Sequence, residues 1–202
     1  ALMSHDPRIG LMRRQQWHES KDLPPNRLGQ PLNGAAVVMD IATGQIRAAV
    51  SVPGISRILL KEQYKILYKD FVNMPLLNRA VGGSYQPGST VKPLVLMAAM
   101  TDNKIGYEDT VECTGMMNPS KPNTMRCWLY KNYHKMHGSL TGVEAIQHSC
   151  NIFFFTMGQR LRSRRLTQWY MRMGLGQSTH CGLAEEVRGL LPNLNRENEV
   201  DA

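Results

Sequence analysis

The sequence lacks long apolar runs and is poor in aromatic residues and in cysteine. Its longest apolar stretch, residues 93–100, is far shorter than the roughly 20 residues that a membrane-spanning helix needs. No basic segment followed by an apolar one opens the chain, as it would in a signal peptide. If the parent protein is exported or anchored, we therefore expect the targeting segment to lie outside these 202 residues.

Glycine and proline are also too scarce for a collagen-like or low-complexity chain, at 17 and 11 residues. With 42% hydrophobic and 20% charged residues, the composition is that of a globular domain. Pro24, Pro25, Gly29 and Pro31 interrupt the polar start of the chain. We therefore predict a lead-in over residues 1–33, with a short helix at 12–19, followed by one domain over residues 34–202.

The net charge of +8 favours anionic partners such as nucleic acids, membrane surfaces or acidic polymers. Nucleic acid is not indicated, because aromatic residues make up only 7% of the chain and no zinc-finger or RNA-binding motif spacing occurs. The densest basic cluster consists of Arg160, Arg162, Arg164 and Arg165. It predicts a solvated helix surface, with a membrane or polymer contact as the alternative.

The four cysteines, Cys113, Cys127, Cys150 and Cys181, include no C-x-x-C pair. A zinc site formed by Cys113, Cys127, His134 and His137 is disfavoured, because its first two ligands lack the usual short spacing. A Cys113–Cys127 disulfide and free buried thiols are equally compatible with the sequence. Cysteine usage therefore leaves the compartment open.

The pattern of apolar and turn residues predicts a mixed α and β chain. Two β-type runs at 34–40 and 45–51, joined by a glycine turn, predict a hairpin. Thr141 and Glu144 form a capping box that starts a helix over 143–148. Residues 102–138 predict short strands and turns. Further helices are expected at 58–71, at 89–100 with apolar residues on nearly every side, from 152 onward and at 167–173.

A serine and a lysine three residues apart, Ser89 and Lys92, share one face of the helix predicted at 89–100. A serine hydroxyl is a weak nucleophile until a base takes its proton, and burial lowers the pKa of a lysine toward that use. The S-x-x-K pattern alone is also compatible with a helix cap and a surface lysine. Ser149 and Asn151 follow at the end of a separately capped helix, and S-x-x-K with S-x-N in this order predicts acyl-transfer chemistry.

Around these motifs the sequence resembles the transpeptidase domain of class B penicillin-binding proteins. The resemblance rests on residues 75–81, on 85–93 with the Ser89 motif, and on 145–154 with the Ser149 motif. Cys127-Trp128 and His137-Gly138 are similar to the elongation-type branch called penicillin-binding protein 2. The resemblance implies an α+β penicillin-binding/β-lactamase-like fold, an antiparallel sheet flanked by helices, truncated here and lacking its C-terminal strands.

By that resemblance Ser89 would be the acylated nucleophile, Lys92 its general base and Ser149 a proton relay to the leaving amine. Asn151 would bind the amide of the substrate or antibiotic. We expect Lys92 Nζ and Ser149 Oγ to lie within hydrogen-bond reach of Ser89 Oγ. The implied reaction is D-alanyl-D-alanine transpeptidation in peptidoglycan synthesis, and it requires neither a metal nor an organic cofactor.

The implied partners are peptidoglycan stem peptides, the lipid-linked precursor, β-lactam antibiotics and the membrane proteins of cell elongation. The implied location is the outer, periplasmic side of a bacterial inner membrane, with a role in cell shape. No lysine follows Lys135, so the family's third motif, Lys-Thr-Gly or Lys-Ser-Gly, has no counterpart in these residues. We expect the chain alone to be nearly inactive and to self-associate through the open edge of its hairpin.

Two other functions stay open. A β-lactam sensor or class D-like β-lactamase also uses S-T-x-K, but such proteins have Ser-x-Val at the second motif, where this chain has Asn151. A non-catalytic interaction fragment is the second alternative, and penicillin labelling separates it from an enzyme.

Overall fold

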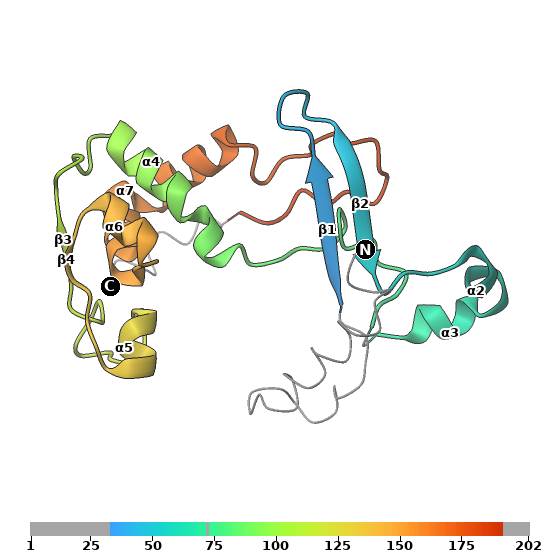
Figure 1. The fold of residues 1–202 in the computed structure, drawn as a ribbon, viewed down its shortest axis with the longest axis horizontal. Coiled ribbons are helices and arrows are strands. Elements are labelled where there is room, and N and C mark those ends of the chain that lie inside the picture. The colour runs from blue at the N-terminus through green and yellow to red at the C-terminus, as the bar shows by residue number, and fades with distance from the viewer. Residues whose placement is uncertain (1–32, 72, 192–202) are drawn as a thin grey trace. The chain divides into compact units, whose positions relative to one another are not determined.

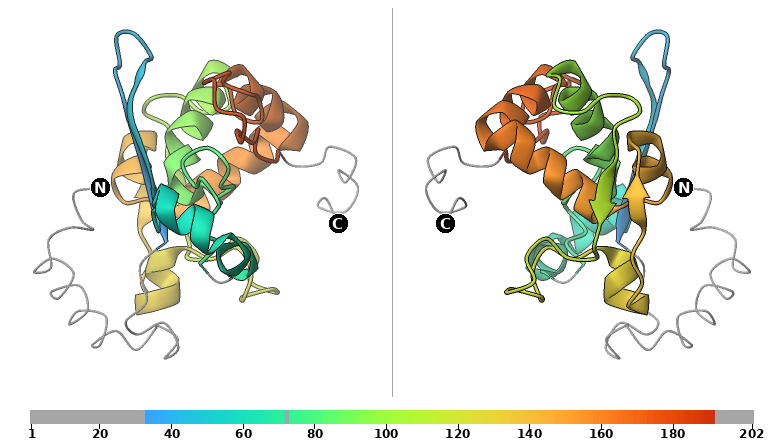
Figure 2. Two further views of the ribbon diagram at one scale, coloured as in Figure 1. Left: turned by 90° about the vertical axis from the view of Figure 1, so that its right-hand side faces the viewer. Right: turned by 90° about the vertical axis from the view of Figure 1, so that its left-hand side faces the viewer.

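The computed structural model describes residues 33–71 and 73–191. The described residues form two compact units, one comprising residues 33–71, 73–84 and 180–187 and the other residues 85–179 and 188–191. Figures 1 and 2 show the elements of each unit. The helix expected at 12–19 lies outside the described residues, and the predicted boundary at residue 33 stays a prediction.

The predicted hairpin is confirmed in the first unit. Strands β1 (Gly34–Met39) and β2 (Ile46–Val52) pair antiparallel, and both are visible as a two-stranded ribbon in Figure 1. The turn forms because Asp40 Oδ1 accepts the backbone N–H groups of Ala42 and Thr43, each at 3.0 Å. Gly44 then adopts a φ of 71°, which glycine reaches without steric cost.

The single helix expected over residues 58–71 is wrong in detail. Two short helices, α2 (Arg57–Glu62) and α3 (Tyr64–Lys69), meet at Gln63, whose φ of −124° and ψ of 22° are not helical. Neither helix buries any residue, so no packed face holds the segment in one continuous helix. Ser56 starts α2 by accepting the N–H of Leu59 at 3.2 Å.

A buried arginine organises the segment that follows α3. Arg79 is buried, and its guanidinium donates to the backbone carbonyls of Asn73 and Met74. Its backbone N–H donates to Ser51 Oγ at 3.0 Å, and that hydroxyl donates to the Leu77 carbonyl at 3.1 Å. These bonds attach the segment to strand β2.

The second unit is built on two packed helices, α4 (Lys92–Thr101) and α7 (Asn151–Arg172). They lie side by side in Figures 1 and 2. The core is formed by small residues of α4 and large residues of α7, with Ala98, Ala99, Phe153 and Met157 all fully buried. The expectation that α4 is buried on every side is wrong, because Met97 and Met100 on its other face are exposed.

Part of the basic cluster fastens α7 to the end of α4. Arg165 donates from Nε and Nη2 to Asp102 at 2.5 and 2.6 Å, and Trp169 Nε1 donates to the same carboxylate at 3.2 Å. Arg160 Nη1 donates to the Lys104 carbonyl at 3.0 Å. Arg160, Arg162 and Arg164 are exposed, in agreement with the predicted solvated helix surface, but Arg160 and the half-buried Arg165 also bind protein groups. Helix α7 kinks at Arg162, where φ is 64°.

The segment between α4 and α7 contains short elements. Strands β3 (Val111–Cys113) and β4 (Gly138–Leu140) pair antiparallel, and helix α5 (Trp128–Tyr133), which the sequence pattern did not predict, lies between them in the chain. Helix α6 (Gly142–Gln147) confirms the predicted capping box, with Glu144 accepting from the Thr141 backbone N–H at 2.8 Å. Among the described residues, no helix is long and apolar enough to cross a membrane.

Candidate active site

Ser89 lies one turn before helix α4 rather than at its cap. It belongs to the short 3₁₀ helix η2 (Gly88–Val91), which begins after Pro87 and runs directly into α4. The Ser89 carbonyl accepts the backbone N–H of Lys92, so the turn that carries the serine is continuous with the helix that carries the lysine. The Ser89 side chain is exposed, as a group that attacks an incoming substrate must be.

Lys92 is the first residue of α4 and only 9% exposed. Its Nζ donates to the backbone carbonyl of Ser149 at 2.8 Å, to Ser149 Oγ at 3.0 Å and to Asn151 Oδ1 at 2.8 Å. The ammonium also lies 5.4 Å from the centre of the Phe154 ring. Ser149 lies in the segment that joins α6 to α7, and Asn151 and Phe154 lie in the first turn of α7.

Burial lowers the pKa of Lys92 below its ordinary value of 10.5, because the charged form loses solvation in the interior. The neighbouring Cys150 and Cys127 raise the pKa of Lys92, but by less. A lowered pKa increases the fraction of neutral amine, which is the form that can accept a proton.

Ser149 connects the serine of the first motif to the lysine. Its Oγ donates to Ser89 Oγ at 3.0 Å and accepts from Lys92 Nζ at 3.0 Å. Ser149 has a φ of 50°, in the left-handed region that non-glycine residues rarely occupy. Strained backbone of this kind persists only where the surrounding structure holds it, and here Lys92 binds both the carbonyl and the hydroxyl of the strained residue.

Asn151 is the first residue of α7, and both ends of its side-chain amide already have protein partners. Oδ1 accepts from Lys92 Nζ, and Nδ2 donates to the Arg126 carbonyl at 3.1 Å. A carboxamide has two lone pairs and two N–H groups, so one of each is left for a further partner. The structure therefore adds a second role for Asn151, which is to orient the lysine.

The four residues singled out from the sequence are thus brought together from positions about 60 residues apart. Ser149 lies within hydrogen-bond reach of Ser89, as expected. The Lys92 side chain reaches the Ser89 hydroxyl through Ser149, since the described residues include no direct hydrogen bond between Lys92 Nζ and Ser89 Oγ. Sequence reasoning missed the contribution of Arg126, which acts through its backbone carbonyl and so leaves no signal in its side chain.

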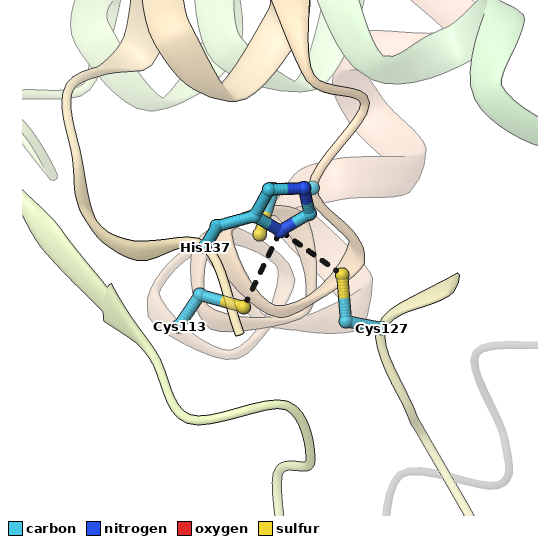
Figure 3. A group of neighbouring side chains, drawn as sticks. Cys113, Cys127 and His137 are labelled. Carbon is cyan, nitrogen blue, oxygen red and sulfur yellow. Dashed lines mark hydrogen bonds between the residues drawn. The ribbon is translucent and has the colours of Figure 1, made fainter. Parts of the chain in front are cut away.

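A second group of reactive side chains lies directly behind this site. Cys113, Cys127, His137 and Cys150 converge, with His137 Nδ1 at 3.6 Å from Cys113 Sγ and 3.4 Å from Cys127 Sγ (Figure 3). The three cysteines are buried free thiols, so the structure contains no Cys113–Cys127 disulfide. His134, which the sequence offered as a ligand beside His137, instead ends α5 with its ring against Tyr130.

These thiols differ in acidity. Burial raises the pKa of Cys150 to about 12. Burial also raises the pKa of Cys127, but hydrogen bonds from the backbone N–H groups of Leu129 and Asn151 outweigh it, and the pKa of Cys127 falls. Burial lowers the pKa of His137, which keeps its imidazole neutral near pH 7.

The sequence matches a family model, that of the penicillin-binding protein transpeptidase domain, over residues 34–201. Among curated relatives, it is 34% identical over 164 residues to the peptidoglycan D,D-transpeptidase MrdA of Escherichia coli strain K12. The match covers 78% of this chain and 25% of that protein. The MrdA protein of Acinetobacter baumannii is 32% identical over 166 residues, covering 79% of this chain and 24% of the relative. The chain therefore spans about a quarter of these relatives.

Solved structures agree with the sequence comparison. The Pseudomonas aeruginosa penicillin-binding protein 2, solved in complex with WCK 5153, superposes with a TM-score of 0.71 at 26% identity, covering 94% of this chain and 42% of that one. A chain from a peptidoglycan synthase complex superposes with a TM-score of 0.73 at 28% identity, covering 95% of this chain and 33% of that one. The predicted α+β transpeptidase fold is confirmed, with only part of the fold contained in these residues.

Proposed function

Starting from the fact that the chain belongs to the penicillin-binding protein transpeptidase family, we propose that it forms part of a serine D,D-transpeptidase of peptidoglycan synthesis. The observation that carries this proposal is the line of hydrogen bonds from Ser89 Oγ through Ser149 Oγ to Lys92 Nζ, with both links at 3.0 Å. This order supports the proposal, because acyl transfer needs a nucleophile, a route for its proton and a base.

In the proposed reaction, neutral Lys92 takes a proton from Ser149 as Ser149 takes the proton of Ser89. The Ser89 oxygen then attacks the carbonyl carbon of the penultimate D-alanine of a stem peptide. The bond to the terminal D-alanine breaks, its amine receives the proton by way of Ser149, and an ester to Ser89 remains. The amine of a second stem peptide attacks this ester, which joins the two peptides and frees Ser89.

The surroundings of the serine support this assignment. The Ser89 backbone N–H is the expected first donor to the oxyanion that forms at the attacked carbonyl. Asn151 fixes Lys92 with Oδ1 and retains a free N–H for the substrate amide. β-Lactams would acylate the same serine, since their strained amide presents the same carbonyl. A periplasmic location on the inner membrane and partners among cell-elongation proteins belong to this proposal, because relatives named MrdA are peptidoglycan D,D-transpeptidases.

The test is covalent labelling by a fluorescent penicillin, in the full-length parent and in the 202-residue chain, with the Ser89 peptide identified by mass spectrometry. In the parent we expect stoichiometric labelling that Ser89→Ala abolishes and that Ser84→Ala, an exposed neighbour, leaves intact. Labelling of the parent elsewhere than on Ser89, or no labelling at all, would contradict the proposal. A non-catalytic fragment would give the second result.

The fate of the acyl-enzyme separates a transpeptidase from a β-lactamase. We expect the penicilloyl ester to persist, whereas a class D-like β-lactamase would hydrolyse it and release free penicilloic acid with turnover. In the chain alone we expect little labelling, because these residues contain no lysine after Lys135 to form the third motif. The loss of a single oxyanion donor costs roughly 100- to 1,000-fold in rate. Rapid stoichiometric labelling of a monomeric chain would show that the third motif is dispensable.

A further inference from the structure

Four basic side chains border a hollow in the second unit, at the end of α4 that is farther from Lys92. This basic hollow has a volume of about 360 Å³. It is lined by Asp102, Lys104, Arg160, Leu161, Arg162 and Arg165. The arginines belong to α7, which lies beside α4 in Figures 1 and 2. Helix α4 has ten residues, so its length of roughly 15 Å separates the basic hollow from the Lys92 end.

One of the four positive charges is already paired inside the protein. Arg165 binds Asp102 through Nε and Nη2, and Trp169 donates to the same carboxylate. Of the residues that line the basic hollow, Asp102 alone is acidic. Four positive charges and one negative charge therefore leave the lining with a net charge of +3, supplied by Lys104, Arg160 and Arg162.

These three cations retain hydrogen-bond donors for a further partner. Within the part of the chain that the structure describes, neither the Lys104 ammonium nor the Arg162 guanidinium has a hydrogen-bonded or ion-paired partner. Arg160 uses Nη1 to donate to the Lys104 carbonyl at 3.0 Å, which leaves the N–H groups of Nε and Nη2. This bond also fixes Lys104 beside α7, so the donors of both elements face one hollow.

The backbone of Arg162 is strained, and its protein contacts do not account for the strain. Its φ of 64° and ψ of 158° interrupt α7 in a region that is almost restricted to glycine. The Arg162 side chain is exposed, so burial gives no reason for an arginine at this position. Strained residues cluster where proteins hold ligands. The charge of Arg162 at the basic hollow is such a reason.

From these observations we infer that Lys104, Arg160 and Arg162 bind a phosphate group, either of a soluble phosphate or diphosphate or of a lipid headgroup. The planar guanidinium matches two phosphate oxygens at once, and the lysine adds a point charge. A phosphate monoester carries a charge of about −1.5 to −2, which suits a site of net charge +3 better than a single carboxylate does. Binding is non-covalent, and the inference does not depend on the proposed function.

The first test is isothermal titration calorimetry of the 202-residue chain with inorganic pyrophosphate, at constant ionic strength in metal-free buffer. We expect one pyrophosphate to bind per chain, and Lys104→Gln to weaken binding about tenfold or more, because a charge-assisted contact is lost.

The matched control is Arg164→Gln. It removes the same charge from an exposed position of α7 that does not line the basic hollow, so it should change the affinity by less than about threefold. The absence of saturable binding, or equal weakening by Lys104→Gln and Arg164→Gln, would overturn the inference.

Arg162→Gly separates ligand binding from folding. Glycine adopts the backbone angles of Arg162 without steric cost, so the midpoint of urea unfolding should rise. Pyrophosphate affinity should fall about tenfold or more, because the guanidinium is lost. A variant that is more stable than the wild type cannot have lost its ligand by unfolding. Wild-type affinity in Arg162→Gly would overturn the inference.

Vesicle flotation identifies the source of the phosphate. The vesicles contain phosphatidylcholine alone or with phosphatidic acid, whose headgroup is a phosphate monoester. Flotation with phosphatidic acid that pyrophosphate displaces and Arg162→Gly abolishes would assign the site to a lipid headgroup. Pyrophosphate binding without flotation would assign it to a soluble phosphate. Flotation that persists in Arg162→Gly and in excess pyrophosphate would overturn the inference, because the net charge of +8 alone would then attract the anions.

Discussion

Replacement of Lys92 by methionine is the sharpest test of the hydrogen-bond arrangement around the second motif. Methionine keeps an unbranched apolar stem of similar length but cannot donate. The change removes three bonds to Ser149 and Asn151 with lengths of 2.8–3.0 Å. Each hydrogen bond of a charged group contributes about 1.5–3 kcal/mol, and the cost of burying the ammonium, several kcal/mol, offsets most of that sum.

The remainder comes from the two acceptors that lose their partner, the Ser149 carbonyl and Asn151 Oδ1, at about 1–3 kcal/mol each, since Ser149 Oγ keeps its bond to Ser89. We therefore expect Lys92→Met to lower the free energy of unfolding by about 2–6 kcal/mol. Urea titration followed by tryptophan fluorescence measures it, and Lys121→Met, at an exposed lysine of the same unit, is the control. A variant as stable as the wild type, or more stable, would refute the reasoning, because desolvation of the ammonium would then outweigh its bonds.

Three further predictions address other parts of the chain. The Arg165 hydrogen bonds lower the pKa of Asp102 from its ordinary 3.8 to about 2, so the stabilisation by ionised Asp102 is present above about pH 4 and lost as the pH falls toward 2. Acid titration should therefore show a stability difference between the wild type and Asp102→Asn that closes over this range. A difference that is constant with pH would contradict the prediction. Thr141→Ala removes the α6 capping box and should cost about 0.5–2 kcal/mol in urea titration, whereas no measurable loss would show that the cap is redundant. In the hairpin, Val38 is 57% exposed and Ile41 is fully exposed, so we expect the chain to self-associate through strand β1. Sedimentation velocity should show that Val38→Lys weakens this association. Equal association of the wild type and Val38→Lys would exclude β1 as the contact.

Local signals predicted the local structure well. The glycine turn defined the hairpin, and the reciprocal bonds of Thr141 and Glu144 defined the start of α6 to within one residue. The predictions that were wrong depended on tertiary context. The spacing over residues 58–71 is helical throughout, but without a buried face nothing prevents the break at Gln63. The apolar exterior of α4 predicted burial on all sides, although the described residues cover only one face.

The candidate active site was predictable as a set of residues and in its Ser89–Ser149 contact, but not in the order of its bonds. The two motifs identify Ser89, Lys92, Ser149 and Asn151, because each carries a reactive or polar group in a recognisable spacing. The order of the bonds does not follow from that spacing. One helical turn suggests a direct Ser89–Lys92 contact, yet the structure connects them through Ser149. The reason is the left-handed backbone at Ser149, a conformation that a serine in the sequence does not predict.

The cysteine cluster shows why a short motif can hide a second site. Within the sequence Ser149-Cys150-Asn151, the middle residue looks like a spacer, and the ligand set that the sequence offered, Cys113, Cys127, His134 and His137, does not contain Cys150. In the structure the side chains on either side of Cys150 reach Lys92, while the Cys150 thiol joins Cys113, Cys127 and His137. The left-handed backbone before Cys150 allows neighbouring side chains to serve opposite faces of the segment. Three consecutive residues can thus belong to two groups of side chains, and a change at Cys150 should affect the packing of the thiols and the Lys92 contacts together.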